Sequence, residues 1–398
     1  MADRHVEVLL VGGGIAAANC ARWLREEGFE GSVALVGREP DPPYDRPPCS
    51  KTYLTGQDSR EDTYFRPDAW WAENDVELMT KTSVMRLDVQ ERVAALSTQE
   101  ELSFDRALLA TGSNVRRLRV DGAALEGVHY LRALGNADAI RADAEGASRA
   151  VIVGGSYIAT EVAASLTELG VACTILMQET IVHERSFGST AGAYFQRVLE
   201  EHGVEVHGND GVARFEGPEH GRVERVVADN GLELPCDLVV MGTGAVPDTM
   251  LAKRAGLELG EHGGVLCSSR LETSTPGIYA AGDICEYDSV VHGETIRVEH
   301  WDVAVNQGKT AALNLLGRDV AHDVVPYFYS DLSDWASLEY VGPAHEWDAE
   351  EVLGSRDDGE FAIRYLRDGR LVACLSVGRS EDLEAARQLL GEGLGDLR

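Results

Sequence analysis

The chain has 398 residues, which is enough for two or three domains that each bury their own core. Apolar residues make up 44% of it and charged residues 26%, as in ordinary globular proteins, and no apolar run approaches the length of a membrane span. The formal net charge of -31 makes nucleic acids and anionic membrane surfaces poor partners, because like charges repel.

The N-terminus and the cysteines limit the class of protein further. The first residues run straight into an apolar strand without a signal-peptide segment, so we expect a cytoplasmic protein. The seven cysteines (positions 20, 49, 173, 236, 267, 285 and 374) form no C-x-x-C pair and no cluster with histidine. We therefore expect no disulfide framework, zinc site, iron–sulfur cluster or other bound metal.

A strand, a glycine turn and a helix are predicted at residues 8–24, where an apolar run ends at glycines and helical spacing begins. Gly12 permits the turn, and Gly14 lets the backbone approach a pyrophosphate. The small Ala17 lets the helix pack on the strand, and Ala16 lies beside it at the helix N-terminus, whose N–H groups face the phosphates. This spacing favours a dinucleotide site over a merely structural glycine turn.

A second strand at 32–37 completes a β-α-β unit, and the proline-rich segment P-Y-D-R-P-P-C-S-K follows at 43–51. The prolines fix the backbone and exclude a helix up to Pro48, so Arg46 lies on a stiff loop and Lys51 at the start of a helix. A guanidinium and an ammonium group held beside a phosphate-binding turn suit a pyrophosphate and an electron-rich ring.

Together these motifs resemble the FAD-dependent ferredoxin reductases of oxygenase systems and their relatives, monodehydroascorbate reductase and apoptosis-inducing factor. The resemblance implies an α/β fold with two Rossmann-like dinucleotide-binding domains, as in glutathione reductase, and a C-terminal α+β domain. It places FAD at the first β-α-β unit and Lys51 near the flavin N5, with a surface lysine at a helix start as the alternative. Arg38 stands where the family has the acid for the adenosine ribose, so we assign that role to Glu39.

Two buried strands that end in glycine turns continue the family pattern. The strand at 104–109 returns the chain to FAD in the family and leads into the second nucleotide domain, and the segment at 236–247 marks the return to the FAD domain. Without the resemblance, each is only a strand followed by a turn. The residues assigned to FAD here are Ala110, Thr111, Gly112 and Gly244.

A second glycine-rich pattern at 150–163 predicts a second β-α-β unit. Two units imply two dinucleotides, and a flavin that receives hydride from a nicotinamide is the simplest chemistry that needs both. The pattern reads Gly154-x-Ser156-x-x-Ala159 where the family usually has three glycines, so weakened or altered nicotinamide binding is a second hypothesis. The residues assigned to this site are Gly154, Ser156, Tyr157, Ile158, Glu161 and Glu179.

Two acids of this unit carry separate predictions. Glu179 can accept a ribose hydroxyl and repel a 2′-phosphate, and no arginine lies beside it before Arg185, so NADH is favoured over NADPH. Glu161 matches a family glutamate near the nicotinamide and is assigned, with Lys51, a catalytic role. The alternative for Glu161 is a solvated helix glutamate.

Further residues resemble the family's flavin site. In the family, the counterpart of Asp283 accepts a hydrogen bond from the ribityl chain, whereas Gly282 and Asp283 alone would be an ordinary turn with an N-cap. Trp301 has core packing as its alternative, and Tyr329 stands where a tryptophan commonly faces the flavin. The remaining residues assigned to the flavin are Glu299, His300, Trp301 and Tyr329.

From about residue 322 onward, apolar and polar residues alternate. This pattern predicts antiparallel strands, with a hairpin turn at Asp368-Gly369 and a helix from Glu381 to Leu390. Family members pack such a domain against the FAD domain. We predict an FAD-binding domain at 1–112 and 240–320, an NAD(H)-binding domain at 113–239, and a C-terminal domain at 321–398.

The resemblance implies an enzyme that passes electrons from NADH through FAD to an external acceptor, usually a [2Fe–2S] ferredoxin, as a monomer or homodimer. The C-x-x-x-x-C disulfide of glutathione-reductase relatives is absent, which excludes an internal disulfide relay. One alternative is a non-catalytic flavoprotein, like apoptosis-inducing factor, with a degraded nicotinamide site. Another is an NADH oxidase or peroxidase that uses Cys49 as a single redox thiol.

Overall fold

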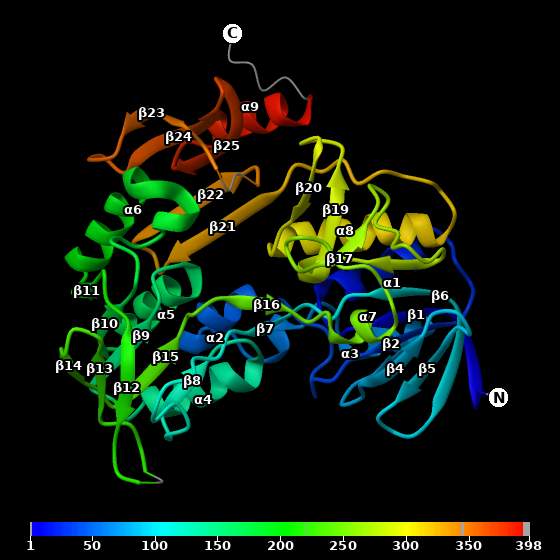
Figure 1. Ribbon diagram of the computed structural model, residues 1–398, viewed down its shortest axis with the longest axis horizontal. Coiled ribbons are helices and arrows are strands. Elements are labelled where there is room, and N and C mark those ends of the chain that lie inside the picture. The colour runs from blue at the N-terminus through cyan, green and yellow to red at the C-terminus, as the bar shows by residue number, and fades with distance from the viewer. Residues whose placement is uncertain (1, 220, 344–345, 393–398) are drawn as a thin grey trace.

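A mostly parallel sheet around the first glycine motif forms the first unit of the computed structural model, which describes residues 2–219, 221–343 and 346–392 (Figure 1). The strand order is β3-β2-β1-β6-β5-β4, and β18 pairs with the end of β6. The apolar runs predicted as strands are buried on both faces, which is typical of a parallel sheet. The strands are β1 (Arg4–Val11), β2 (Val33–Val36), β3 (Val76–Met79), β4 (Val84–Asp88), β5 (Val93–Leu96), β6 (Glu101–Leu109) and β18 (Ile278–Ala280).

Helices α1 (Ile15–Glu26) and α8 (Trp301–Leu315) lie side by side against this sheet. The two helices approach closely at Gly308 of α8. A side chain there would not fit, because its Cβ would lie only 2.4 Å from the carbonyl oxygen of Ala16. The proline-rich loop makes a 3₁₀ turn at Pro47–Ser50, earlier than predicted, because proline fits the first positions of a helical turn. The other elements of this unit are α2 (Thr52–Thr55), α3 (Asp68–Glu73), α7 (Met250–Arg254), β17 (Val265–Cys267), β19 (Cys285–Ser289) and β20 (Glu294–Arg297), with short 3₁₀ turns at Glu61–Thr63 and Gly282–Ile284.

The second glycine motif lies in a second parallel sheet, with strand order β11-β10-β9-β15-β8. Both β-α-β units predicted from the sequence are therefore present, and the α/β fold class is confirmed. The elements are β8 (Val128–Tyr130), α4 (Leu134–Ala144), β9 (Arg149–Val153), α5 (Tyr157–Glu168), β10 (Ala172–Leu176), α6 (Glu184–Glu201), β11 (Glu205–His207) and β15 (Leu238–Met241), and an antiparallel sheet of β12 (Val212–Glu216), β13 (Arg225–Ala228) and β14 (Glu233–Pro235).

The chain crosses between the two units twice, in adjacent segments. Strand β7 (Ser113–Val115) leaves the first unit, and β16 (Ala245–Pro247) returns to it and pairs with β7 antiparallel. The boundary that the sequence puts at residue 240 falls inside β15, which pairs with β9 and β8 in the second sheet. We therefore propose that the second unit extends through Met241 and that the β7–β16 pair divides the units.

A five-stranded antiparallel sheet with helix α9 forms the third unit, in the strand order β21-β22-β25-β24-β23. The predicted hairpin at Asp368-Gly369 is confirmed, since both residues have positive φ, as a two-residue turn requires. The predicted terminal helix is confirmed as α9, while residues 344–345 and 393–398 of the predicted domain lie outside the described residues. The elements are β21 (Tyr327–Leu332), β22 (Ala336–Val341), β23 (Ala349–Ser355), β24 (Glu360–Arg367), β25 (Arg370–Val377) and α9 (Ser380–Gly391).

The third unit shares an apolar core with the second unit, in addition to its expected contact with the first unit. The tilted ring of Phe187 of α6 packs against Tyr340 of β22 with ring centres 5.0 Å apart, and Tyr194 packs edge to face on Phe361 of β24 at 4.9 Å. Contact with the first unit is made by β21 against α8. The third unit therefore contacts both nucleotide-binding units (Figure 1).

A break in helix α6 is part of this interface. Gly188 has φ 75° and ψ 177°, outside the helical region, and a Cβ there would lie 2.5 Å from the Glu350 carboxylate. The hydroxyl of Tyr365 donates a hydrogen bond of 2.9 Å to the carbonyl oxygen of Phe187, the residue before the break.

Among the described residues, no helix is both long enough and apolar enough to cross a bilayer.

Replacing Tyr365 with Phe should therefore lower the free energy of unfolding by about 1–2 kcal/mol, because a buried hydrogen bond at the helix break is lost. Tyr194→Phe is the matched control. Tyr194 lies on α6, the helix with the break, and its hydroxyl has no hydrogen-bond partner among the described residues. Urea unfolding should show the larger loss for Tyr365→Phe, and equal losses would contradict this role for the Tyr365 hydroxyl.

Candidate functional site

A cavity of about 880 Å³ lies where the three units meet, at the upper end of the range for ligand pockets. Most of the residues that the sequence assigns to cofactors line it. Three do not: Ala17 is a buried residue of α1, Gly154 packs against the backbone of Gly242, and Glu179 lies outside the lining. Those that line it are Gly12, Gly14, Ala16, Glu39, Arg46, Lys51, Ala110, Thr111, Gly112, Ser156, Tyr157, Ile158, Glu161, Gly244, Gly282, Asp283, Glu299, His300, Trp301 and Tyr329.

The first glycine turn leaves an open cradle at the N-terminus of α1. Gly12 has φ +128°, and a Cβ there would lie 2.1 Å from the carbonyl oxygen of Ala110, so only glycine lets β1 and β6 approach this closely. Gly14 is the N-cap of α1 without a side-chain cap, and a Cβ there would project into empty space. The free N–H groups of α1 and this empty space fit the pyrophosphate of the expected FAD.

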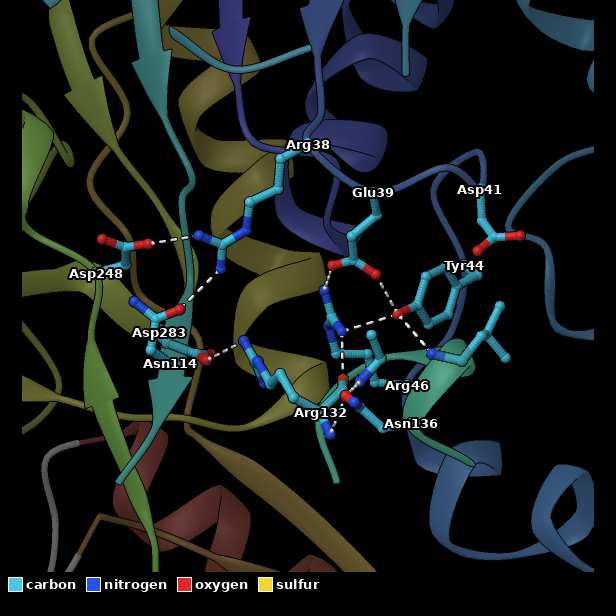
Figure 2. A network of polar contacts seen from close by, with 12 residues as sticks. Arg38, Glu39, Asp41, Tyr44, Arg46, Asn114, Arg132, Asn136, Asp248 and Asp283 are labelled. Atoms are coloured by element: carbon cyan, nitrogen blue, oxygen red, sulfur yellow. Dashed lines mark hydrogen bonds and ion pairs between the residues drawn. The ribbon is translucent and has the colours of Figure 1, made fainter. Parts of the chain in front are cut away.

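Beside this cradle, Glu39 and Arg46 form a polar network with Tyr44 and Arg132 (Figure 2). The Glu39 carboxylate accepts hydrogen bonds of 2.6 Å from both the Arg46 guanidinium and the Tyr44 hydroxyl. Burial opposes the charge of Glu39, but Arg46 outweighs it and lowers the pKa of the carboxyl group. Arg132 then reaches Asp283, with 3.2 Å between Nη2 and Oδ2. Both carboxylate oxygens of Glu39 are therefore engaged by the protein itself.

The ammonium group of Lys51 lies between two acids from different units. Its Nζ is 3.4 Å from Glu161 of α5 and 3.1 Å from Asp331 of β21, and it lies 4.5 Å above the centre of the Tyr329 ring. Glu161 also accepts hydrogen bonds of 2.5 Å from Ser50 and Ser330. The side chain of Lys51 is only 14% exposed. The alternative of a surface lysine is therefore wrong.

Burial raises the pKa of Glu161, and the side chain is 5% exposed, so the alternative of a solvated helix glutamate is also wrong. Burial would lower the pKa of Lys51, but Glu161 and Asp331 outweigh it and raise that pKa above the ordinary lysine value. Lys51 is therefore a fixed positive charge at neutral pH. It faces a cavity wall that includes Tyr329 and Trp301.

Residues at the start of α8 complete this wall. The indole N–H of Trp301 donates a hydrogen bond of 2.7 Å to Asp45, so Trp301 is both packed and turned to the cavity. Arg297 pairs with Glu299 at 2.5 Å, and the ring of His300 lies 4.7 Å from that of Phe328. These contacts orient the side chains that the sequence assigns to the flavin edge.

In the second glycine turn, the residues that differ from the family pattern are accommodated by neighbouring glycines. The methyl group of Ala159 packs at Gly242, where a Cβ would lie 2.9 Å from it. The buried Met177 lies under Gly155, where a Cβ would meet its sulfur at 2.3 Å. Ser156 is the N-cap of α5 with no side-chain cap, so the first N–H groups of α5 remain available to a phosphate.

Glu179 forms an ion pair with Arg185, six positions later in the sequence. Arg185, at the start of α6, lies 2.7 Å from the Glu179 carboxylate, and Arg185 itself lines the cavity. A cation therefore stands beside the acid expected to select NADH. The preference for NADH stays a prediction.

Cys49 lies in the cavity wall but is 3% exposed, and burial raises the pKa of its thiol to about 12. A redox-active thiol must be available as the thiolate at neutral pH. The geometry therefore disfavours the single-cysteine oxidase or peroxidase.

Several contacts of the site could not be derived from the sequence. Arg132, which lines the cavity, and Asp331, which lies outside the lining, pair with assigned residues, and Arg38 pairs with Asp248. Each of these contacts joins segments far apart in the sequence. The stretch 82–85 also lines the cavity, although it carries no motif. Among the described residues, no group of three or more His, Cys, Asp or Glu side chains is placed to hold a metal ion.

Comparison with known proteins gives consistent results over nearly the whole chain. Residues 6–308 match the family described as pyridine nucleotide-disulphide oxidoreductase, and residues 327–396 match the reductase C-terminal family. The chain is 34% identical to the ferredoxin reductase subunit of 5,5'-dehydrodivanillate O-demethylase from a Sphingobium species, over 98% of this chain and 94% of that protein.

Two further similarities extend this comparison. The chain is 33% identical to the ferredoxin–NAD(+) reductase subunit of the benzene 1,2-dioxygenase system of Pseudomonas putida, over 96% of this chain and 92% of that protein. The crystal structure of the covalent putidaredoxin reductase–putidaredoxin complex superposes with a TM-score of 0.92 at 31% identity, covering 100% of this chain and 96% of the other.

We predict that the folded protein has no fast-reacting thiol, because all seven cysteines are free and buried. At pH 8 the fraction of Cys49 present as thiolate should be about one in ten thousand. Titration with a chromogenic disulfide should therefore be slow in the native state and reach seven thiols in denaturant. A rapidly reacting thiol that disappears in Cys49→Ser would contradict the assignment.

Asp331→Asn should destabilise the protein by about 1 kcal/mol or less, because Asp331 is a third exposed. The pKa of Lys51 is higher in the folded protein than its ordinary value of 10.5. The ion pair between Lys51 and Asp331 therefore stabilises the fold fully below pH 10.5, and this stabilisation is lost as the pH rises through the pKa of Lys51 in the folded protein. Urea unfolding should thus show a loss at pH 8 that shrinks above pH 10.5. Asp334→Asn, in the same hairpin, is the exposed control. A loss that is equal at both pH values would show that Asp331 does not act through the lysine charge.

Proposed function

Because the chain belongs to the pyridine nucleotide-disulphide oxidoreductase family and carries the reductase C-terminal domain, we propose that it passes electrons from NADH through FAD to an iron–sulfur protein. When bound, FAD supplies the hydride acceptor and the donor of single electrons. The observation that carries the proposal is the ammonium group of Lys51, held between Glu161 and Asp331 at the wall of a cavity that both glycine turns reach.

The chain's own residues have distinct parts in this reaction. The fixed charge of Lys51 favours the negative charge that a flavin ring gains on reduction. Glu161 orients Lys51 and is itself held by Ser50 and Ser330, so the ammonium group has little freedom to turn away. Trp301 and Tyr329 cover the same wall and limit the access of water.

An external acceptor is required because the chain offers no internal one. All seven cysteines are free and buried, and none forms a disulfide. Relatives of this chain are named ferredoxin reductases, and putidaredoxin reductase is captured in a complex with putidaredoxin. These names support a ferredoxin as the acceptor, and the family resemblance makes the [2Fe–2S] type the expected one. We also propose a cytoplasmic location, since free cysteines suit a reducing compartment.

The non-catalytic alternative is less well supported. It rests on Ser156, Ala159 and Met177, but the last two fit complementary glycines at 242 and 155. Ser156 leaves the N-terminus of α5 uncapped and open to the cavity. A turn that has kept its packing and its free N–H groups supports continued nicotinamide binding.

Anaerobic stopped-flow mixing of the purified flavoprotein with each nicotinamide tests the proposal. NADH should bleach the FAD absorbance band within seconds, and NADPH should act more slowly, because Glu179 can accept a ribose hydroxyl and repels a 2′-phosphate, a repulsion that its ion pair with Arg185 reduces. Equal rates would overturn the preference for NADH. If neither nucleotide reduces the flavin within minutes, the protein is not a reductase.

The acceptor is tested with the same preparation. Cytochrome c should be reduced rapidly by NADH only when a [2Fe–2S] ferredoxin is added, because single electrons then leave through the iron–sulfur protein. Reduction at the same rate without any ferredoxin would remove the iron–sulfur protein from the proposed reaction while leaving the hydride-transfer step intact.

A further inference from the structure

The adenosine end of the first nucleotide site is built differently from the family pattern. Strand β2 ends at Val36, and the position that should carry the acid for the adenosine ribose holds Arg38. Glu39, the next acid, is engaged on both oxygens by Arg46 and Tyr44 (Figure 2). Arg46 and Tyr44 therefore fill one acceptor site on each oxygen of Glu39 and set the orientation of its carboxylate.

A different acid faces the end of β2. The guanidinium group of Arg38 lies 3.1 Å from Oδ2 of Asp248 and 2.8 Å from Oδ1 of Asn114 (Figure 2). Asn114 lies on β7, and Asp248 follows β16 directly. The two crossing strands thus bring an acid and an amide from outside the first β-α-β unit to its adenosine end.

Asp248 is held firmly in this position. Its backbone N–H donates a hydrogen bond of 2.8 Å to the carbonyl oxygen of Gly112, and its own carbonyl oxygen accepts one of 2.7 Å from the Thr111 hydroxyl. Thr111 and Gly112 line the cavity, and Asp248 lines it with them. Arg38 binds Oδ2 of the Asp248 carboxylate. Within the part of the chain that the structure describes, Oδ1 has no hydrogen-bond donor, so it can accept one from a ligand.

Apolar surface flanks this polar pair. Met85 of β4 is 60% exposed and Met250 of α7 is 59% exposed, and both line the cavity. Strand β4 and helix α7 are in contact, so the two side chains belong to one end of the cavity. Large exposed methionines inside a binding cavity indicate a planar apolar group that covers them when bound.

We propose that Asp248, oriented by Arg38 and Asn114, takes the place of the family's ribose acid and accepts hydrogen bonds from the adenosine ribose of FAD. Arg38 and the two methionines then pack around the adenine. This proposal rests on the assignment of FAD to the first unit. It gives FAD a contact with the crossing strands, so the bound adenosine bridges the first unit and the segment that leads to the second.

The test compares FAD with its analogue that lacks the adenosine 2′-hydroxyl, titrated into apoprotein and followed by flavin fluorescence. The unaltered protein should bind the analogue about tenfold more weakly, because a charged acceptor loses its donor. Asp248→Ala should bind FAD about tenfold more weakly than the unaltered protein and no longer distinguish it from the analogue. FMN, which lacks the adenosine, should bind Asp248→Ala as it binds the unaltered protein, which also shows that the variant is folded.

Glu39→Gln is the matched control. It perturbs Arg46 and should weaken both dinucleotides alike, so their ratio should stay near tenfold. If Glu39→Gln removes the discrimination and Asp248→Ala keeps it, or if the unaltered protein shows none, the proposal is overturned. Failure of the apoprotein to bind FAD or FMN at all would instead contradict the proposed function.

Discussion

The rest of the structure depends on the buried charge of Lys51. A buried ammonium group costs several kcal/mol unless acids and hydrogen-bonding groups surround it. Lys51 comes from the first unit, Glu161 from the second and Asp331 from the third. The charge is therefore compensated only when all three units are packed together. The same requirement sets a positive charge at the cavity wall, where a flavin ring that gains an electron pair benefits from it.

Packing between the units is arranged to keep this cluster closed. The third unit shares its apolar core with α6 of the second unit and also touches α8 of the first. The break at Gly188 and the hydrogen bond from Tyr365 fix how α6 meets the third unit. Because β21 carries Asp331 and Tyr329, the position of the third unit decides where these two partners of Lys51 lie.

Several arginines of this highly acidic protein line the nucleotide cavity. Arg38, Arg46 and Arg132 all line the cavity, and each is paired with an acid or a carbonyl oxygen. The whole chain has a net charge of -31, so these arginines supply local positive charge where anionic phosphates are expected to bind.

Local patterns determined the two β-α-β units, the glycine turns, the hairpin at Asp368-Gly369 and the terminal helix, because apolar period and turn chemistry act over a few residues. The resemblance carried by these motifs also placed most cavity residues. Neither the local patterns nor the resemblance predicted which acids pair with Lys51 and Arg38. Lys51 and Asp331 are 280 positions apart, and Arg38 and Asp248 are 210 apart. Such pairs depend on how whole units are oriented, and only tertiary packing decides that orientation.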